Sequence, residues 1–324
     1  MKKNSLIMAL ILAAFCLDAC HFKTKTDNKK LNIVATIYPE YDWVLQILGE
    51  EKANAEVTLL LDNGVDLHSY QPTAEDILKI SECDLFIYVG GESDEWVEDV
   101  MASANNKDLV TIDLLETLGE KAKEEELIEG MQGEEEEEED EGEEGPEYDE
   151  HVWLSLKNAG IFVDEISEKL QSLDAEHAET YKKNAEAYKE KLLDLDKRFE
   201  EVVSASSTKT LLFGDRFPFR YLIEDYGLSY YAAFIGCSAE TEASFETIAF
   251  LSQKTDELAL SSVITIEGSD QKIAKTIIEN TSTKDQKILV MDSMQSVTSK
   301  DLKTDISYLS IMEKNLETLE EALK

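Results

Sequence analysis

The run LFIYV at Leu85–Val89 decides the fold class, because its apolar and aromatic side chains follow one another without the polar alternation of a half-exposed strand. Continuous runs of this kind are typical of strands covered on both faces, as in a parallel sheet between helices. Stretches with the helical spacing of apolar residues precede and follow it, at Thr73–Ile80 and Trp96–Ala104. The region therefore predicts an α/β architecture.

The alternation of strand and helix occurs in two sets along the chain. Between the sets lies a largely helical region, Val152–Val203, in which Asp174 looks like an N-cap and neither Pro nor Gly follows. A single helix from Asp174 to Val203 would be about 45 Å long, at about 1.5 Å per residue. We predict an α/β protein of two lobes, each a parallel β-sheet flanked by helices, joined by a long backbone helix. Further strands are expected at Leu31–Ile37, Val57–Leu61, Leu109–Ile112, Thr210–Phe213, Tyr230–Ile235, Val263–Ile266 and Ile288–Met291.

The length of 324 residues also favours two lobes, since a single hydrophobic core rarely grows beyond about 250 to 300 residues. We expect the following divisions: a signal peptide at 1–19, a tether at 20–30, an N-terminal α/β lobe at 31–150 with an acidic loop at 121–150, a helical region at 151–205, and a C-terminal α/β lobe at 206–324.

The charge of the chain is strongly negative. It has 31 Lys and Arg residues against 70 Asp and Glu residues, a formal net charge of -39, which repels phosphate backbones and argues against nucleic-acid binding. The segment Glu124–Glu150 holds 17 carboxylates and no Lys or Arg, including the run Glu134–Asp140. Such a segment is expected to be a solvated loop. This loop either collects divalent cations near a ligand-binding cleft or acts only as a solvated spacer.

The N-terminus has the pattern of an export signal. Lys2 and Lys3 precede the apolar run Leu6–Phe15, which is too short to span a bilayer, and Leu17–Cys20 follows at cleavage distance. The sequence LDAC resembles a bacterial lipobox, in which Cys20 would become the acylated first residue. An ordinary secretory peptide is the alternative. We expect an extracytoplasmic protein anchored by lipidated Cys20 to the outer face of the cytoplasmic membrane.

The residues that follow the predicted strands include ligands for a divalent metal. Ligands of doubly wound folds bind at the carboxyl ends of the strands, so we expect the site in the cleft between the lobes. His68 lies in the loop Asn63–Tyr70, His151 ends the acidic segment, and Asp292 directly follows a strand. Imidazole and carboxylate groups suit zinc, although no CxxC or HExxH spacing supports the site locally. Gly214–Arg216 is expected in a loop at the same edge.

Five segments, spread from one end of the predicted lobes to the other, carry a family pattern: Ile37–Pro39, Leu67–Pro72, Phe86–Gly91, His151–Leu154 and Tyr308–Met312. Together they resemble the zinc and manganese class of ABC-transporter solute-binding lipoproteins. The resemblance covers essentially the whole chain after the signal peptide. It implies two lobes bridged by a helix, with zinc or manganese held between them and handed to a membrane permease.

The resemblance implies a ligand set residue by residue. The two histidine ligands fall on His68 and His151, and the carboxylate ligand of the last strand falls on Asp292. The third ligand position of the family falls on Arg216, whose guanidinium cannot bind a cation. Asp215, which directly precedes Arg216, is one candidate for the third ligand in its place.

Three further candidates for the third ligand are Cys237, Glu240 and Glu242, which follow the next strand of the same lobe. A thiolate would favour zinc over manganese, because sulfur is the softer ligand. For Arg216 we predict pairing with Asp215 or Asp292, which would orient these carboxylates.

These observations predict a non-enzymatic receptor, monomeric, that binds Zn2+ with high affinity and delivers it to the permease of an ABC importer. A Mn2+ receptor of the same class is one alternative. A zinc metallohydrolase is another, with His68, His151 and Asp292 as its protein ligands and water in the fourth position. An adhesive function cannot be read from these residues.

Overall fold

The computed structural model describes residues 30–133, 147–238 and 242–324. The chain divides into Met1–Lys30 and Leu31–Lys324, and only the second unit is considered below. The predicted signal peptide with Cys20, residues 134–146 of the predicted acidic loop and Glu240 lie outside the described residues. Within the described part of the chain, no helix is both long enough and apolar enough to cross a membrane.

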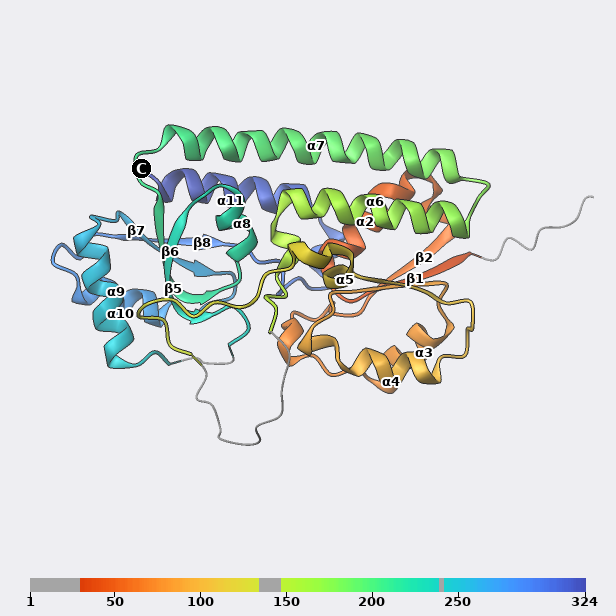
Figure 1. Ribbon diagram of the computed structural model, residues 1–324, viewed down its shortest axis with the longest axis horizontal. Coiled ribbons are helices and arrows are strands. Elements are labelled where there is room, and N and C mark those ends of the chain that lie inside the picture. Colours follow the sequence, from red (N-terminus) through yellow and green to blue (C-terminus); the bar gives the residue numbers. More distant parts are fainter. Residues whose placement is uncertain (1–29, 134–146, 239–241) are drawn as a thin grey trace, which may run out of the picture. The chain divides into compact units, whose positions relative to one another are not determined.

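Two parallel sheets of four strands confirm the predicted fold class (Figure 1). Their strand orders, β2-β1-β3-β4 and β6-β5-β7-β8, are equivalent, as expected of two similar α/β halves. The first sheet consists of β1 (Leu31–Ala35), β2 (Ala55–Leu59), β3 (Leu85–Tyr88) and β4 (Val110–Asp113). The second consists of β5 (Thr210–Phe217), β6 (Ser229–Ile235), β7 (Ser262–Ile266) and β8 (Lys287–Met291).

Helices follow most of the strands and cover the sheets. Thr73 caps α3 as predicted: its hydroxyl accepts the N–H of Asp76 at 3.2 Å, and the Asp76 carboxylate accepts the N–H of Thr73 at 3.0 Å. The helices of the first half are α2 (Tyr38–Leu48), α3 (Ala74–Glu82), α4 (Trp96–Ser103) and α5 (Leu114–Leu118). The middle of the chain forms α6 (Leu156–Leu173) and α7 (Ala178–Ala205), and the second half adds α8 (Arg220–Asp225), α9 (Phe245–Glu257), α10 (Lys272–Asn280) and α11 (Tyr308–Ala322).

The long helix α7 begins later than predicted. Asp174 ends α6 instead of capping α7, so this prediction was wrong. The Asp174 carboxylate accepts hydrogen bonds from His177 Nδ1 and from the Tyr181 hydroxyl, each at 2.7 Å. The Asp174 side chain is therefore bound to one side chain of the turn, His177, and one of α7, Tyr181, and does not cap the helix.

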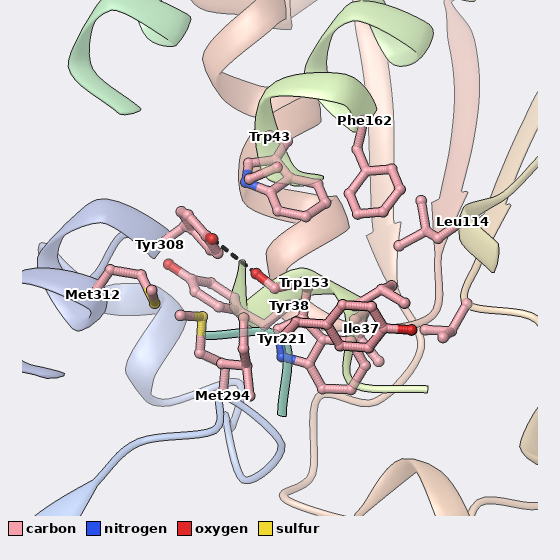
Figure 2. Close-up of a cluster of buried hydrophobic side chains, with 14 of the residues drawn as sticks. Ile37, Tyr38, Trp43, Leu114, Trp153, Phe162, Tyr221, Met294, Tyr308 and Met312 are labelled. Atoms are coloured by element: carbon pink, nitrogen blue, oxygen red, sulfur yellow. Dashed lines mark hydrogen bonds between the residues drawn. The ribbon is translucent and has the colours of Figure 1, made fainter. Parts of the chain in front are cut away.

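The two halves share one hydrophobic core, so α7 is not their only connection. Trp43 of α2 lies at the centre of a buried aromatic cluster, with ring centroids 5.6 Å from Phe162 of α6 and 5.2 Å from Tyr308 of α11 (Figure 2). The Tyr308 hydroxyl donates to the carbonyl of Trp153 at 2.7 Å. Because α2 belongs to the first half and α11 to the second, this cluster packs the halves together.

Strand β5 is longer than predicted. It continues past Phe213, and after a register shift it pairs Arg216 with Phe234 and Phe217 with Ile235 of β6. Asp215 and Arg216 therefore lie in the strand rather than in a loop that follows it. Gly and Asp are depleted in strands, so Gly214 and Asp215 give no sign in the sequence that the strand continues past Phe213.

Glu40 is a fully buried carboxyl group in the first turn of α2, with 0% exposure. Its Oε2 accepts the backbone N–H groups of Thr36 at 2.8 Å and Ile37 at 3.2 Å, and so closes the connection from β1 to α2. Burial raises the pKa of Glu40 from 4.5 to about 8, against these hydrogen bonds, which lower it.

This pKa predicts a pH dependence of stability in the metal-free protein. The folded carboxyl keeps its proton up to about pH 8, whereas the unfolded one loses it near 4.5. The folded state therefore binds more protons in this window, and Glu40 contributes stability that is lost as the pH rises, at up to about 1.4 kcal/mol per pH unit.

The variant Glu40→Gln should remove this contribution to the slope of the unfolding free energy against pH, measured by urea unfolding at several pH values. Glu50→Gln, at an exposed site just after the same helix, should keep the wild-type slope. An unchanged slope in Glu40→Gln would contradict the assignment.

Candidate metal centre

His68 lies on the short 3₁₀ turn Leu67–Ser69, in the loop that follows β2. The Asp66 carboxylate accepts the backbone N–H of His68 at 3.1 Å and so starts this turn. The imidazole Nδ1 lies 2.8 Å from Ser93 Oγ and 3.3 Å from Glu150 Oε2. Because an ionised carboxylate can only accept, the proton of the neutral ring lies on Nδ1 and Nε2 is left as a free ligand atom.

His68 and Glu150 shift each other's pKa through this contact. Burial disfavours the imidazolium, but the hydrogen bond and charge of Glu150 outweigh it and raise the pKa of His68 above 6.5. Burial likewise acts to raise the pKa of Glu150, but His68 outweighs it and the net shift is downward. Glu150 also accepts the N–H of Ser93 at 2.9 Å. Gly91 makes room for it, since a Cβ there would lie 2.4 Å from Glu150 Oε1.

His151 is completely buried directly before the turn Val152–Leu154. Asp149 Oδ1 lies 3.1 Å from its Nδ1 and also accepts its backbone N–H at 2.9 Å. The carboxylate thus orients the ring and leaves Nε2 free, which is the usual arrangement of a metal-binding histidine. Gly236, just after β6, is required here, because a Cβ would lie 2.8 Å from His151 Cε1.

The two free nitrogens face each other. His68 Nε2 and His151 Nε2 are 3.2 Å apart, although the residues are separated by 83 positions in the chain. Two neutral rings held in this way direct lone pairs at one another, which is unfavourable unless a proton or a cation lies between them. Two nitrogens bound to one tetrahedral zinc ion, each at about 2.0–2.1 Å, are about 3.3 Å apart. The observed spacing matches this value.

Cys237 completes a group of three ligand atoms. The Sγ of Cys237 and ring nitrogens of His68 and His151 all lie within 4.8 Å of one another, and we call these residues the His–His–Cys group. Cys237 and Cys83 are both free thiols. Burial, and then the negative charges of nearby carboxylates, raise the pKa of Cys237 well above 9. The thiol therefore keeps its proton until a cation displaces it.

Among the described residues, the structure does not bring the predicted carboxylates Asp215, Asp292 and Glu242 into this group. Asp215 lies in β5, where its carboxylate accepts the N–H of Arg216 at 3.0 Å, and it lines a neighbouring hollow of about 440 Å³. Asp292 accepts the N–H of Met294 at 2.8 Å, and Glu242 is exposed. The extension of β5 and these local hydrogen bonds hold the carboxylates elsewhere, and the thiol of Cys237, one of the predicted alternatives, lies beside the two imidazoles where Asp215 was expected.

Arg216 connects the two halves beside the group. Its guanidinium forms an ion pair with Asp66 at 2.6 Å and donates to the carbonyl of Ser238 at 3.4 Å. The predicted pairing with Asp215 or Asp292 was wrong, because the side chain extends from β5 toward the loop of His68. Arg216 and Cys237 both line a hollow of about 300 Å³ that also contains His68.

Sequence reasoning missed the residues that orient the imidazoles. Asp149 and Glu150 precede His151 directly, but they are also the last members of a long acidic run, which hid their separate role. Ser93 carried no signal of its own. The pair Gly236-Cys237 was a usable signal, because a glycine before a ligand allows close approach of another side chain.

The family described as zinc-uptake complex component A, periplasmic (ZnuA), matches residues 33–322. The chain belongs to this family. A curated relative, the high-affinity zinc uptake system protein ZnuA of Bacillus subtilis, is 30% identical in an alignment that covers 99% of this chain and 98% of that protein. The family assignment therefore rests on nearly the whole length of both chains.

Other relatives are longer. The zinc-binding lipoprotein AdcA of Streptococcus pneumoniae is 35% identical over 99% of this chain, but the chain spans only 61% of its length. The crystal structure of the Zn(II)-bound ZnuA-like domain of that protein matches with a TM-score of 0.70 and 30% identity, over 91% of this chain and 99% of the domain. This chain is thus similar to the ZnuA-like part of AdcA.

Proposed function

We propose that this chain is the solute-binding component of an ABC importer, and that it binds Zn2+ at the His–His–Cys group and delivers it to a membrane permease. The observation that carries the proposal is the 3.2 Å separation of the two Nε2 atoms, each left free by a carboxylate or hydroxyl at Nδ1. Imidazole nitrogen and thiolate sulfur are the preferred ligands of zinc. Membership of the ZnuA family and likeness to zinc-binding relatives support this assignment.

The thiol of Cys237 favours zinc over manganese. Manganese prefers oxygen ligands, whereas a thiolate is a soft ligand that selects zinc. A receptor for Mn2+ would be expected to present carboxylates where this structure presents a thiol.

For the N-terminal segment we propose lipid attachment at Cys20 and a location on the outer face of the cytoplasmic membrane. The sequence LDAC and the name of the AdcA relative, a lipoprotein, support this. We further propose that the protein binds zinc without catalysing a reaction, because its relatives are named for zinc binding and uptake. A monomer remains our proposal for its oligomeric state.

Metal titration and complementation test the function together. The metal-free protein should bind one Zn2+ per chain, much more tightly than Mn2+, in competition with a chelator. A strain that lacks the gene should fail to grow at scarce zinc and should be restored by the wild-type gene but not by the double variant His68→Ala, His151→Ala. Preference for manganese, or restoration of growth by the double variant, would overturn the proposal.

A further inference from the structure

The acidic segment contributes an ordered arm to the metal centre. Glu124 pairs with Tyr148 in an antiparallel bridge, and the N–H of Glu125 donates to the carbonyl of Glu147 at 2.9 Å. Further along, Gln132 pairs with Phe234 at the edge of β6. The arm 122–133 is therefore fixed at both ends, once against the residues before His151 and once against the strand that leads to Cys237.

Glu125 points inward from this arm. The side chains of Glu124 and Glu126 are exposed, whereas Glu125 between them is partly buried, as expected where an extended chain alternates its sides. Both carboxylate oxygens of Glu125 are buried and have no hydrogen-bond partner among the described residues. Burial raises the pKa of Glu125, and the thiol and backbone N–H of Cys237, which lie close to it without forming a hydrogen bond of normal geometry, lower the pKa most.

The other carboxylates beside the His–His–Cys group already have partners. A buried carboxylate without a partner is costly, because it has lost its hydration and gained no hydrogen bond in return. Glu125 differs from its neighbours in this respect. The engaged carboxylates are Asp66, which pairs with Arg216, Asp149, which accepts from His151, and Glu150, which accepts from Ser93.

We infer that Glu125 is the fourth zinc ligand, so that the arm 122–133 closes the site built by the His–His–Cys group. This inference rests on the proposed function. Two neutral imidazoles, one thiolate and one carboxylate give a tetrahedral zinc site with no net charge, which suits a buried position. Glu125 is not a member of the group in the present structure, so at least one of its distances to the three ligand atoms exceeds 4.8 Å. Binding therefore requires its carboxylate to turn toward the two imidazoles.

The variant Glu125→Gln tests the inference, with Glu124→Gln as a matched control on the outward side of the same arm. Zinc affinity is measured by competition with a chelator at constant pH near neutrality, and folding is checked by thermal melting. We expect Glu125→Gln to weaken zinc binding by about 100-fold or more. Loss of a residue that only hydrogen-bonds to a metal ligand already costs about 10- to 100-fold in affinity, and loss of a ligand should cost at least as much. Glu124→Gln should bind as the wild type does, and Glu125→Asp should recover part of the loss.

Cobalt substitution separates coordination from an indirect effect. In Co2+-loaded protein, Glu125→Gln should change the visible ligand-field bands, while the sulfur-to-cobalt charge-transfer band of Cys237 persists. Wild-type affinity and bands in Glu125→Gln, with zinc binding lost in His68→Ala, would overturn this inference and leave the proposed function intact. Wild-type affinity in His68→Ala as well would overturn the proposed site itself.

Discussion

Replacing His151 with alanine is expected to weaken zinc binding by roughly 100- to 1,000-fold. The binding free energy of a four-ligand zinc site is on the order of 10–16 kcal/mol near neutral pH, so one ligand carries roughly 2.5–4 kcal/mol of it. His151 is completely buried, and its Nε2 lies 3.2 Å from that of His68. Loss of the His151 side chain leaves a cavity in which a water molecule can replace the imidazole, but water is a weaker zinc ligand. The affinity is measured by competition with a chelator of known zinc affinity.

His177→Ala is the matched control for this prediction. His177 is also bound to a carboxylate through Nδ1, at 2.7 Å from Asp174, but it lies in the turn before α7 and outside the His–His–Cys group. This variant should keep wild-type affinity. Equal affinities for the two variants would show that the zinc ion is bound elsewhere.

Replacing Cys237 with serine is expected to reduce zinc affinity by roughly 100-fold and to narrow the preference for zinc over manganese. A serine hydroxyl keeps its proton near neutral pH and is a poor ligand for zinc, whereas manganese gains little from sulfur. Titration of Cys237→Ser with both metals measures the change in each affinity. A loss of equal size for the two metals would contradict the role of the thiolate in selectivity.

Cys83→Ala is the thiol control. Cys83 lies in the core directly before β3, with 1% exposure, and is the other free thiol of the described chain. In the wild type, bound zinc should slow alkylation of Cys237, and the protection should persist in Cys83→Ala. Equal rates of alkylation with and without zinc would exclude Cys237 as a ligand.

The sheets could be predicted from the sequence because the central strands β1, β3, β5 and β7 are largely covered on both faces. Runs such as LFIYV at Leu85–Val89 then consist of apolar and aromatic residues throughout, and the alternation with helices indicates a parallel sheet. The extension of β5 could not be predicted, since Asp215 and Arg216 have side chains that usually lie outside strands. Their place depends on pairing with β6, which is a tertiary effect.

Within the candidate site, the two histidines could be singled out, but their partners could not. Histidine is rare in this chain, with four residues in all, so each one was informative. Carboxylates are abundant, and Glu125, Asp149 and Glu150 look like any other members of an acidic run. Only the folded structure shows that Glu125 is buried without a partner while Glu124 beside it is exposed.

X-ray absorption at the zinc edge, on protein loaded with one equivalent of Zn2+, tests the ligand set most directly. The His–His–Cys group predicts one sulfur at about 2.3 Å, nitrogen and oxygen neighbours at about 2.0–2.1 Å, and the outer-shell scattering of two imidazole rings. A zinc ion surrounded by oxygen alone, without sulfur or imidazole scattering, would contradict the binding of zinc by His68, His151 and Cys237.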